Sequence, residues 1–241
     1  MKKQPEKKEK EKKVVLHKKK PLSEEQRIKN LFRDRATVTL DLGCGENKMP
    51  GAIGVDFRAM NGVEIVQNLS LFPWRSIPTE CADVVYTSHL LEHINPAPSN
   101  PQLSALIKLL VGKKAITQTD VDTHIGEHEF LGGFLRFCDE VWRTLKPGGQ
   151  FISTFPFASS PGFWQDPTHI NGITHVTLAY LDPLAKVEGT EQYYGLYNIY
   201  RPMPWKIVRC FYDINGFLEV CLEKRRIDKS YRVTSNSGMG K

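Results

Sequence analysis

The chain has 241 residues, of which 40% are hydrophobic, enough to bury one core and to predict a single folded domain. Its formal net charge is +6, but residues 1–20 hold ten lysines and three glutamates, a net of +7 that leaves −1 for the remainder. The folded body is therefore nearly neutral, and the excess positive charge lies in the tail. We expect no fixed structure in this lysine-rich tail, residues 1–22, which could contact nucleic acid or an acidic partner weakly or could serve only to keep the chain in solution.

Two classes of protein are disfavoured by the pattern of apolar residues and cysteines. No apolar segment reaches the length of a membrane span, and the basic start lacks the apolar core of a signal peptide. The five cysteines are scattered and form no CxxC pair, which favours reduced thiols in a cytoplasmic protein.

The first half of the chain alternates between short apolar runs and helical patterns. A capped helix is expected over 23–32, and strands over 38–41, 52–56, 63–69 and 82–88. Gly43-Cys44-Gly45 breaks the chain after the first strand, and a helix is expected to begin near His89.

The second half begins with an insertion at about 95–128. Prolines at 96, 98 and 101 end the preceding helix, a short helix is expected over 102–111, and a longer one over 130–145. A Lys146–Gly149 turn leads to a strand over 151–155, and a long aromatic loop follows to about 204. Runs over 205–212 and 217–223, separated by Asn215-Gly216, predict a hairpin. The whole predicts an α/β fold, a Rossmann-like mostly parallel sheet with one antiparallel strand, in one domain over 23–241.

The glycine turn lies where ligands bind in open α/β sheets, at the carboxyl ends of the strands. A dinucleotide site would have a third glycine where Lys48 stands, and its acidic residue would come later than Asp56. The segments Asp41–Gly45, Gly54–Asp56, Ser88–His93 and Leu145–Gly149 instead resemble, in order, four motifs of the class I S-adenosylmethionine-dependent methyltransferases.

This resemblance implies an S-adenosylmethionine site. Glycines would let the backbone approach the aminoacyl end of the cofactor, Asp56 would accept the ribose hydroxyls, and Asn68-Leu69 would flank the adenine. The cofactor-binding residues it implies are Asp41, Gly43, Cys44, Gly45, Asp56, Asn68, Leu69, Ser88 and His89.

The chain departs from the family between the first two strands. Pro50-Gly51 leaves no room for a helix there, which removes the helix dipole that would face the cofactor carboxylate. We expect Lys48, with Asn47 as a second candidate, to bind that carboxylate directly. The alternative is that Lys48 is a solvated loop residue.

Two histidine pairs raise the question of a metal. His89-x-x-Glu92-His93 matches a pattern of zinc peptidases with both histidines on one helical face, but it follows a buried strand within the methyltransferase order. His124 and His128, in the insertion, are read as surface residues. The sequence interpretation therefore includes no metal.

A third group of residues follows the strand over 151–155. Asp166 and His169, flanked by Phe163 and Trp164, could orient a methyl acceptor and remove its proton, and we take them as candidate catalytic residues. The alternative is an Asp-Pro turn with a packed histidine.

The expected activity is transfer of a methyl group from S-adenosylmethionine to an acceptor that the sequence does not identify. The absence of an Asn/Asp-Pro-Pro-Tyr/Phe motif and of a Pro-Cys pair disfavours two kinds of DNA methylation. Two alternatives stay open: a methyltransferase-like module without turnover, and another adenosylmethionine-dependent transfer such as aminopropyl transfer. The tyrosine-rich segment 186–204 could be a substrate lid or an oligomer contact.

Overall fold

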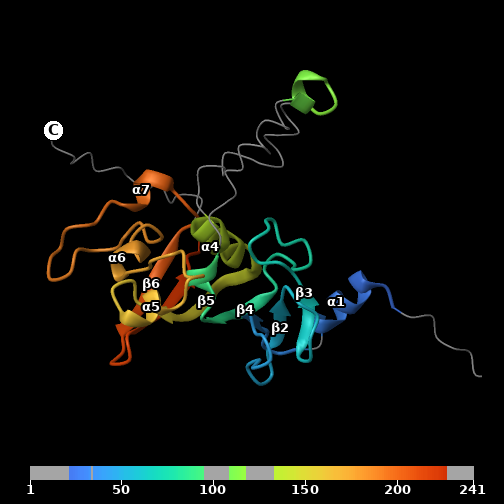
Figure 1. Ribbon diagram of the computed structural model, residues 1–241, viewed down its shortest axis with the longest axis horizontal. Coiled ribbons are helices and arrows are strands. Elements are labelled where there is room, and N and C mark those ends of the chain that lie inside the picture. Colours follow the sequence, from blue (N-terminus) through green and yellow to red (C-terminus); the bar gives the residue numbers. More distant parts are fainter. Residues whose placement is uncertain (1–21, 34, 95–108, 118–132, 227–241) are drawn as a thin grey trace, which may run out of the picture.

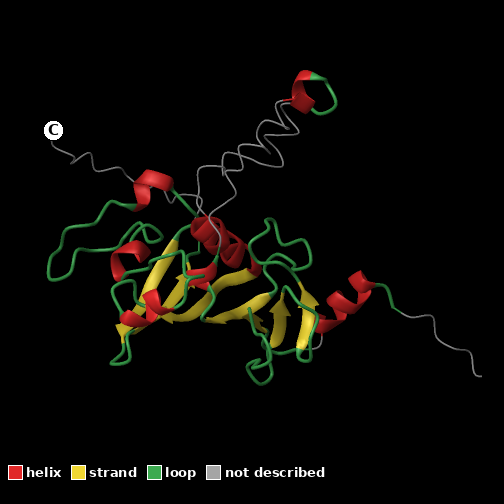
Figure 2. Ribbon diagram, in the orientation of Figure 1, coloured by secondary structure: helices red, strands yellow, loops and turns green. Residues whose placement is uncertain are grey.

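The computed structural model describes residues 22–33, 35–94, 109–117 and 133–226. Their centre is a seven-stranded sheet in the order β3-β2-β1-β4-β5-β7-β6 (Figures 1 and 2). The strands are β1 (Thr39–Leu42), β2 (Ile53–Asp56), β3 (Val63–Val66), β4 (Ala82–Ser88), β5 (Leu145–Pro156), β6 (Trp205–Tyr212) and β7 (Phe217–Lys224).

One strand of the seven runs against the others. The pairs β1–β2, β1–β4, β2–β3 and β4–β5 are parallel, whereas β7 is antiparallel to both β5 and β6. This strand order and direction are those of the class I methyltransferase architecture, so the predicted fold class is confirmed.

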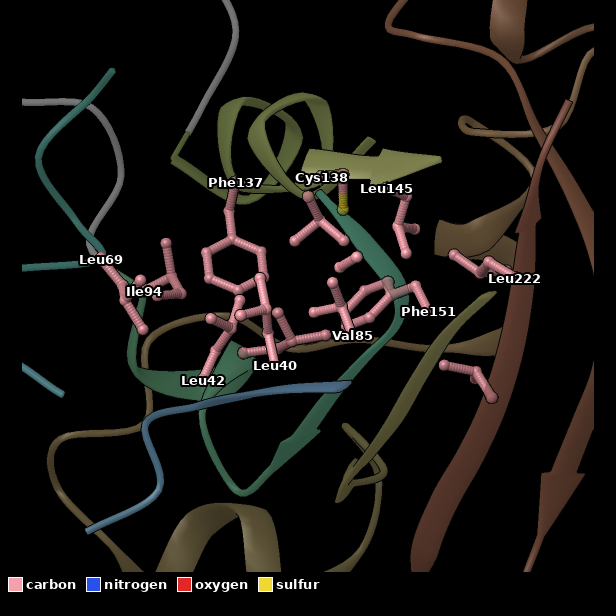
Figure 3. Close-up of a cluster of buried hydrophobic side chains, with 14 of the residues drawn as sticks. Leu40, Leu42, Leu69, Val85, Ile94, Phe137, Cys138, Leu145, Phe151 and Leu222 are labelled. Carbon is pink, nitrogen blue, oxygen red and sulfur yellow. The ribbon is translucent and has the colours of Figure 1, made fainter. Parts of the chain in front are cut away.

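The core lies between the sheet and α4 (Gly133–Thr144). Figure 3 shows Phe137 and Cys138 of this helix directed at Leu40, Leu42 and Val85 of the central strands. Phe137 and Leu40 are completely buried. Full burial of one such side chain contributes about 1.5–3 kcal/mol, so this layer holds the strand ends in fixed positions.

The ends of the described fold follow the sequence closely. Helix α1 (Glu24–Arg33) begins with a capping box, because Ser23 Oγ accepts from Gln26 N–H and Gln26 Oε1 accepts from Ser23 N–H. At the other end, the β6–β7 hairpin turns at Gly216 with φ 90°, and Asp213 Oδ1 accepts from the amides of Asn215 and Phe217.

Three predicted boundaries were wrong. The strand expected over 63–69 ends at Val66, and β5 begins at Leu145, so that the Lys146–Gly149 turn is a bulge inside it. The helix expected from His89 is a single 3-10 turn, η1 (Leu91–His93), within the described residues. The two histidines of the H-x-x-E-H pattern therefore do not share a helical face.

The remaining helices are short: α5 (Pro161–Gln165), α6 (His175–Leu178) and α7 (Tyr197–Tyr200). The five cysteines are free thiols. Among the described residues, no helix has the length and apolar character needed to cross a membrane. The basic tail, His124, His128 and most of the 95–128 insertion lie outside the described residues.

Candidate functional site

Two backbone amides of the glycine turn donate hydrogen bonds to residues at the end of β2. Gly43 N–H donates to Val55 O at 2.8 Å, and Gly45 N–H donates to Asp56 Oδ2 at 3.1 Å. Gly43 and Gly45 have φ values of 70° and 51°, which favour glycine. A Cβ on Gly43 would also lie 2.9 Å from Leu90 Cδ1, so a side chain at this position would displace Leu90, two residues after the end of β4.

Asp41 holds the short loop that replaces a helix between β1 and β2. Its side chain is buried, and Oδ2 accepts from Met49 N–H at 2.7 Å. Burial raises the pKa of Asp41 although this hydrogen bond and Lys48 oppose the shift. The loop contains no helix, as Pro50-Gly51 predicted.

In the structure, Lys48 pairs with a carboxylate of the protein and does not face the space where the cofactor carboxylate was expected. Its Nζ lies 2.5 Å from Glu64 Oε1 on β3, while Glu64 Oε2 accepts from Gly54 N–H at 2.6 Å. Lys48 lines neither of the hollows described below. In this structure the Glu64 carboxylate on β3 takes the ammonium group, and the expected pairing of Lys48 with the cofactor carboxylate stays a prediction.

Two hollows lie at the carboxyl edge of the sheet. The first has a volume of about 520 Å³, and its lining includes Gly43, Asp56, Asn68, Leu69, His89 and His93. The second has a volume of about 450 Å³, and its lining includes Asp41, Gly43, Cys44, Gly45, Asn47 and Ser88. Gly43 lines both, so the glycine turn separates two adjoining compartments. All the predicted cofactor-binding residues except Lys48 line one or the other.

Asp56 faces the first hollow with a buried carboxylate. Oδ2 accepts from Gly45 N–H, and Oδ1 accepts from Arg58 N–H at 3.1 Å. Each carboxylate oxygen has a second lone pair, so Asp56 can still accept two further hydrogen bonds. Its position at the end of β2 directs these free lone pairs toward the hollow that it lines.

Asn68 and Leu69 follow β3 on the far side of this hollow. Asn68 Oδ1 accepts from Ser70 N–H at 2.9 Å, and the Leu69 side chain is buried. An amide beside an apolar side chain suits a flat heterocycle with polar edges.

Cys44 is not a nucleophile in this setting. Burial, followed by the nearby carboxylates of Asp41 and Asp56, raises the pKa of the Cys44 thiol to about 11. The neutral thiol contributes shape to the second hollow, because only the thiolate reacts readily.

His89 is held in an unusual backbone conformation beside the first hollow. Its φ is 52°, its N–H donates to Thr154 O at 2.9 Å, and its ring packs edge-on against Phe217. Interaction with the Glu92 carboxylate raises the pKa of His89. A left-handed non-glycine residue at the end of a strand is the kind of strain that accumulates at functional sites.

Asp166 and His169 lie near one another but do not form a hydrogen-bonded pair. His169 Nε2 is 3.8 Å from Asp166 Oδ2, and neither residue lines the two hollows. Asp166 is exposed and accepts from the amide and hydroxyl of Thr168, which lower its pKa. The His169 side chain is only 8% exposed and packs beside His93, with ring centroids 4.7 Å apart.

Glu92 is the residue that the sequence did not single out for this site. Its side chain is completely buried, and it lies with His93 and His169 in one cluster. The H-x-x-E-H pattern named Glu92 and His93, but the third member is 76 positions further along the chain than His93. Only the fold brings His169 to η1.

No protein-family model matches the sequence, and no match was found among curated proteins. Solved structures with a similar chain trace include several methyltransferases. The antibiotic-resistance methyltransferase Kmr is 13% identical with a TM-score of 0.43, covering 85% of this chain and 94% of its own. A 16S rRNA (adenine(1408)-N(1))-methyltransferase from Catenulisporales acidiphilia is 12% identical with a TM-score of 0.43. The match covers 86% of this chain and 93% of that methyltransferase.

An S-adenosylmethionine-dependent methyltransferase from Mesorhizobium loti is 13% identical with a TM-score of 0.38, covering 83% of this chain and 98% of its own. At these identities and scores, neither a residue's role nor a substrate transfers from those proteins to this chain. The function has to be argued from the two hollows themselves.

Proposed function

We propose that this protein binds S-adenosylmethionine across the two hollows and transfers its methyl group to an acceptor. The observation that carries the proposal is the position of Gly43, which lines both compartments at the ends of parallel strands. An elongated ligand crossing this glycine would place its nucleoside in one hollow and its amino-acid end in the other.

The first hollow supplies the groups that a nucleoside needs. Asp56 would accept hydrogen bonds from the two ribose hydroxyls through its remaining lone pairs. The adenine would lie against Leu69, with the Asn68 amide at its polar edge. The backbone around Gly43 approaches closely because no side chain intervenes.

The second hollow supplies the groups that an amino acid needs. The buried Asp41 carboxylate would pair with the ammonium group of the methionine end. In place of a helix dipole, the Asn47 amide lines this hollow and would donate to the cofactor carboxylate. Asn47 is the second of the two candidates that the sequence offers for this role, and it is the one that lines the hollow.

The transfer itself demands little covalent chemistry from the protein. An acceptor atom attacks the methyl carbon in line with the sulfonium; the carbon–sulfur bond breaks, and sulfur leaves as a neutral thioether while the acceptor proton passes to a base or to water. Holding the two reactants in line supplies much of the rate enhancement. His89 and His93 line the first hollow, and His169 packs against His93 behind it.

The direct test is incubation of the purified chain with methyl-labelled S-adenosylmethionine and separate pools of RNA, protein and small-molecule acceptors. Label in one pool, lost with Asp56→Asn, supports methyl transfer. Tight cofactor binding without label in any pool would favour the module without turnover. A product heavier than the acceptor by an aminopropyl group, formed from decarboxylated cofactor, would favour the other transfer.

A further inference from the structure

A buried carboxylate without a hydrogen bond lies behind the first hollow. Glu92 is completely buried, and neither Oε1 nor Oε2 has a hydrogen-bond partner among the described residues. One ligand atom from each of Glu92, His93 and His169 lies within 4.8 Å of the other two. An ionised carboxylate in such a place is costly unless something else neutralises it.

The groups around Glu92 do not fulfil that role by hydrogen bonding. His89 Nδ1 is 3.3 Å from Oε1 and forms an ion pair with it when the imidazole is protonated, which leaves Oε2 without a hydrogen-bond partner among the described residues. His169 Nε2 is 4.0 Å from the same oxygen. The 4.0 Å between His169 Nε2 and Glu92 Oε1 leaves space for an ion that binds both atoms at once.

One hydrogen bond of His169 determines which of its ring nitrogens carries the proton and which one presents a lone pair to Glu92. Nδ1 lies 2.7 Å from the carbonyl oxygen of Phe163, which can only accept, so Nδ1 carries the proton. In the neutral ring Nε2 then has a free lone pair. Two acceptors, Nε2 of His169 and Oε1 of Glu92, thus face each other.

His93 is oriented in the same manner by Thr168. The Thr168 hydroxyl donates its single proton to Asp166 Oδ1 at 2.7 Å, so its oxygen must accept from His93 Nδ1 at 3.0 Å. His93 Nε2 is then left as an acceptor. Histidines that bind metals commonly donate their other ring N–H to a carbonyl, carboxylate or water in this manner.

Backbone hydrogen bonds join the two halves of the cluster. Ile170 N–H and Asn171 N–H both donate to Glu92 O, at 2.8 and 3.1 Å, and Asn171 Nδ2 donates to Leu91 O at 2.9 Å. The loop after α5 is therefore fixed to η1, and the three side chains are positioned before any ligand arrives.

We propose that Glu92, His93 and His169 bind a divalent transition-metal ion. One carboxylate and two imidazoles suit zinc, iron or cobalt, whereas magnesium and calcium prefer oxygen ligands. Three protein ligands leave coordination positions open. Because His93 also lines the first hollow, the site adjoins the place where an acceptor would enter. Metal binding at this cluster does not depend on the proposed methyl transfer.

The test is titration of the chelator-treated full chain with Co²⁺, followed by visible absorption and calorimetry, and then displacement with Zn²⁺. We expect one cobalt ion with a visible absorption spectrum of nitrogen and oxygen ligation. Glu92→Gln keeps the shape of the side chain but removes the charge. It should weaken cobalt binding by more than about tenfold, since loss even of outer partners costs that much.

The matched control is His175→Ala, which removes a histidine that stacks on Phe157 outside the cluster. It should bind cobalt like the wild type. His93→Gln serves as a second ligand variant, and circular dichroism of each metal-free variant establishes folding. No cobalt uptake by the wild type, or equal affinity for the wild type and both ligand variants, would overturn the proposal.

Discussion

His169 donates from Nδ1 to the carbonyl oxygen of Phe163 at 2.7 Å and thereby turns Nε2 toward the Glu92 carboxylate, 4.0 Å away. The sequence predicted that Asp166 and His169 act on a methyl acceptor, and in the structure a backbone carbonyl orients the histidine ring. Asp166 instead accepts from Thr168, whose oxygen contacts His93. The two candidate catalytic residues thus belong to a wider network around Glu92, and their role toward an acceptor stays a prediction.

Thr168→Val tests this network without touching a proposed metal ligand. Valine has a similar shape but cannot accept from His93 Nδ1, so the ring loses its orientation. We expect cobalt affinity to fall by about 10- to 100-fold, the usual effect of losing an outer partner of a ligand. Calorimetry with Co²⁺ measures the change, and S-adenosylmethionine affinity, measured on the same sample, should stay at the wild-type value. Unchanged cobalt binding would show that Thr168 does not orient His93.

Lys48→Ala distinguishes two roles for the loop between β1 and β2. Because Lys48 pairs with Glu64, we expect cofactor affinity within about twofold of the wild type. The free energy of unfolding should fall by no more than about 1 kcal/mol, as for a partly exposed ion pair. Asn47→Ala should weaken cofactor binding instead. If Lys48→Ala instead bound the cofactor more weakly than Asn47→Ala, the result would favour direct pairing of the lysine with the cofactor carboxylate.

Much of the fold could be predicted because its signals are local. The strand over 82–88 matches β4 residue for residue, and Asn215-Gly216 marked the hairpin turn correctly. Most of the cofactor-binding candidates follow strand ends, and parallel strands bring their carboxyl ends to one edge. The positions of Asp41 and Asp56 at that edge could therefore be inferred from strand boundaries, whereas Asn68 came from the resemblance, since β3 ends at Val66.

The rest depends on contacts between distant segments. The apolar and polar pattern after Ser88 suits a helix, yet the backbone of His89 turns left-handed and only η1 forms. The partner of Lys48 comes from a neighbouring strand, and its charge alone did not indicate whether it would meet Glu64 or a ligand. Glu92 looked like a helix residue, and nothing local indicated that its carboxylate would be buried beside His169.

Gly54 provides a test of how tightly the β2–β3 edge is built. A Cβ at this position would lie 2.4 Å from the carbonyl oxygen of Gly62, a backbone atom that cannot easily move. Gly54→Ala should lower the free energy of unfolding by about 1–3 kcal/mol, the usual cost of overpacking. A Cβ at Gly112 would have no atom within 4 Å. Gly112→Ala should therefore raise the free energy of unfolding by no more than about 1 kcal/mol. Urea denaturation measures both, and equal stability of the two variants would contradict the predicted clash.

The central claim is that the paired hollows bind S-adenosylmethionine, and calorimetry with the wild type and Asp56→Asn tests it most directly. We expect the wild type to bind one cofactor molecule. The variant should bind about 10- to 100-fold more weakly, because hydrogen bonds to a charged group contribute about 1.5–3 kcal/mol. Circular dichroism establishes that Asp56→Asn stays folded. A folded wild-type protein that binds no S-adenosylmethionine, or a folded variant that binds it equally well, would contradict the account.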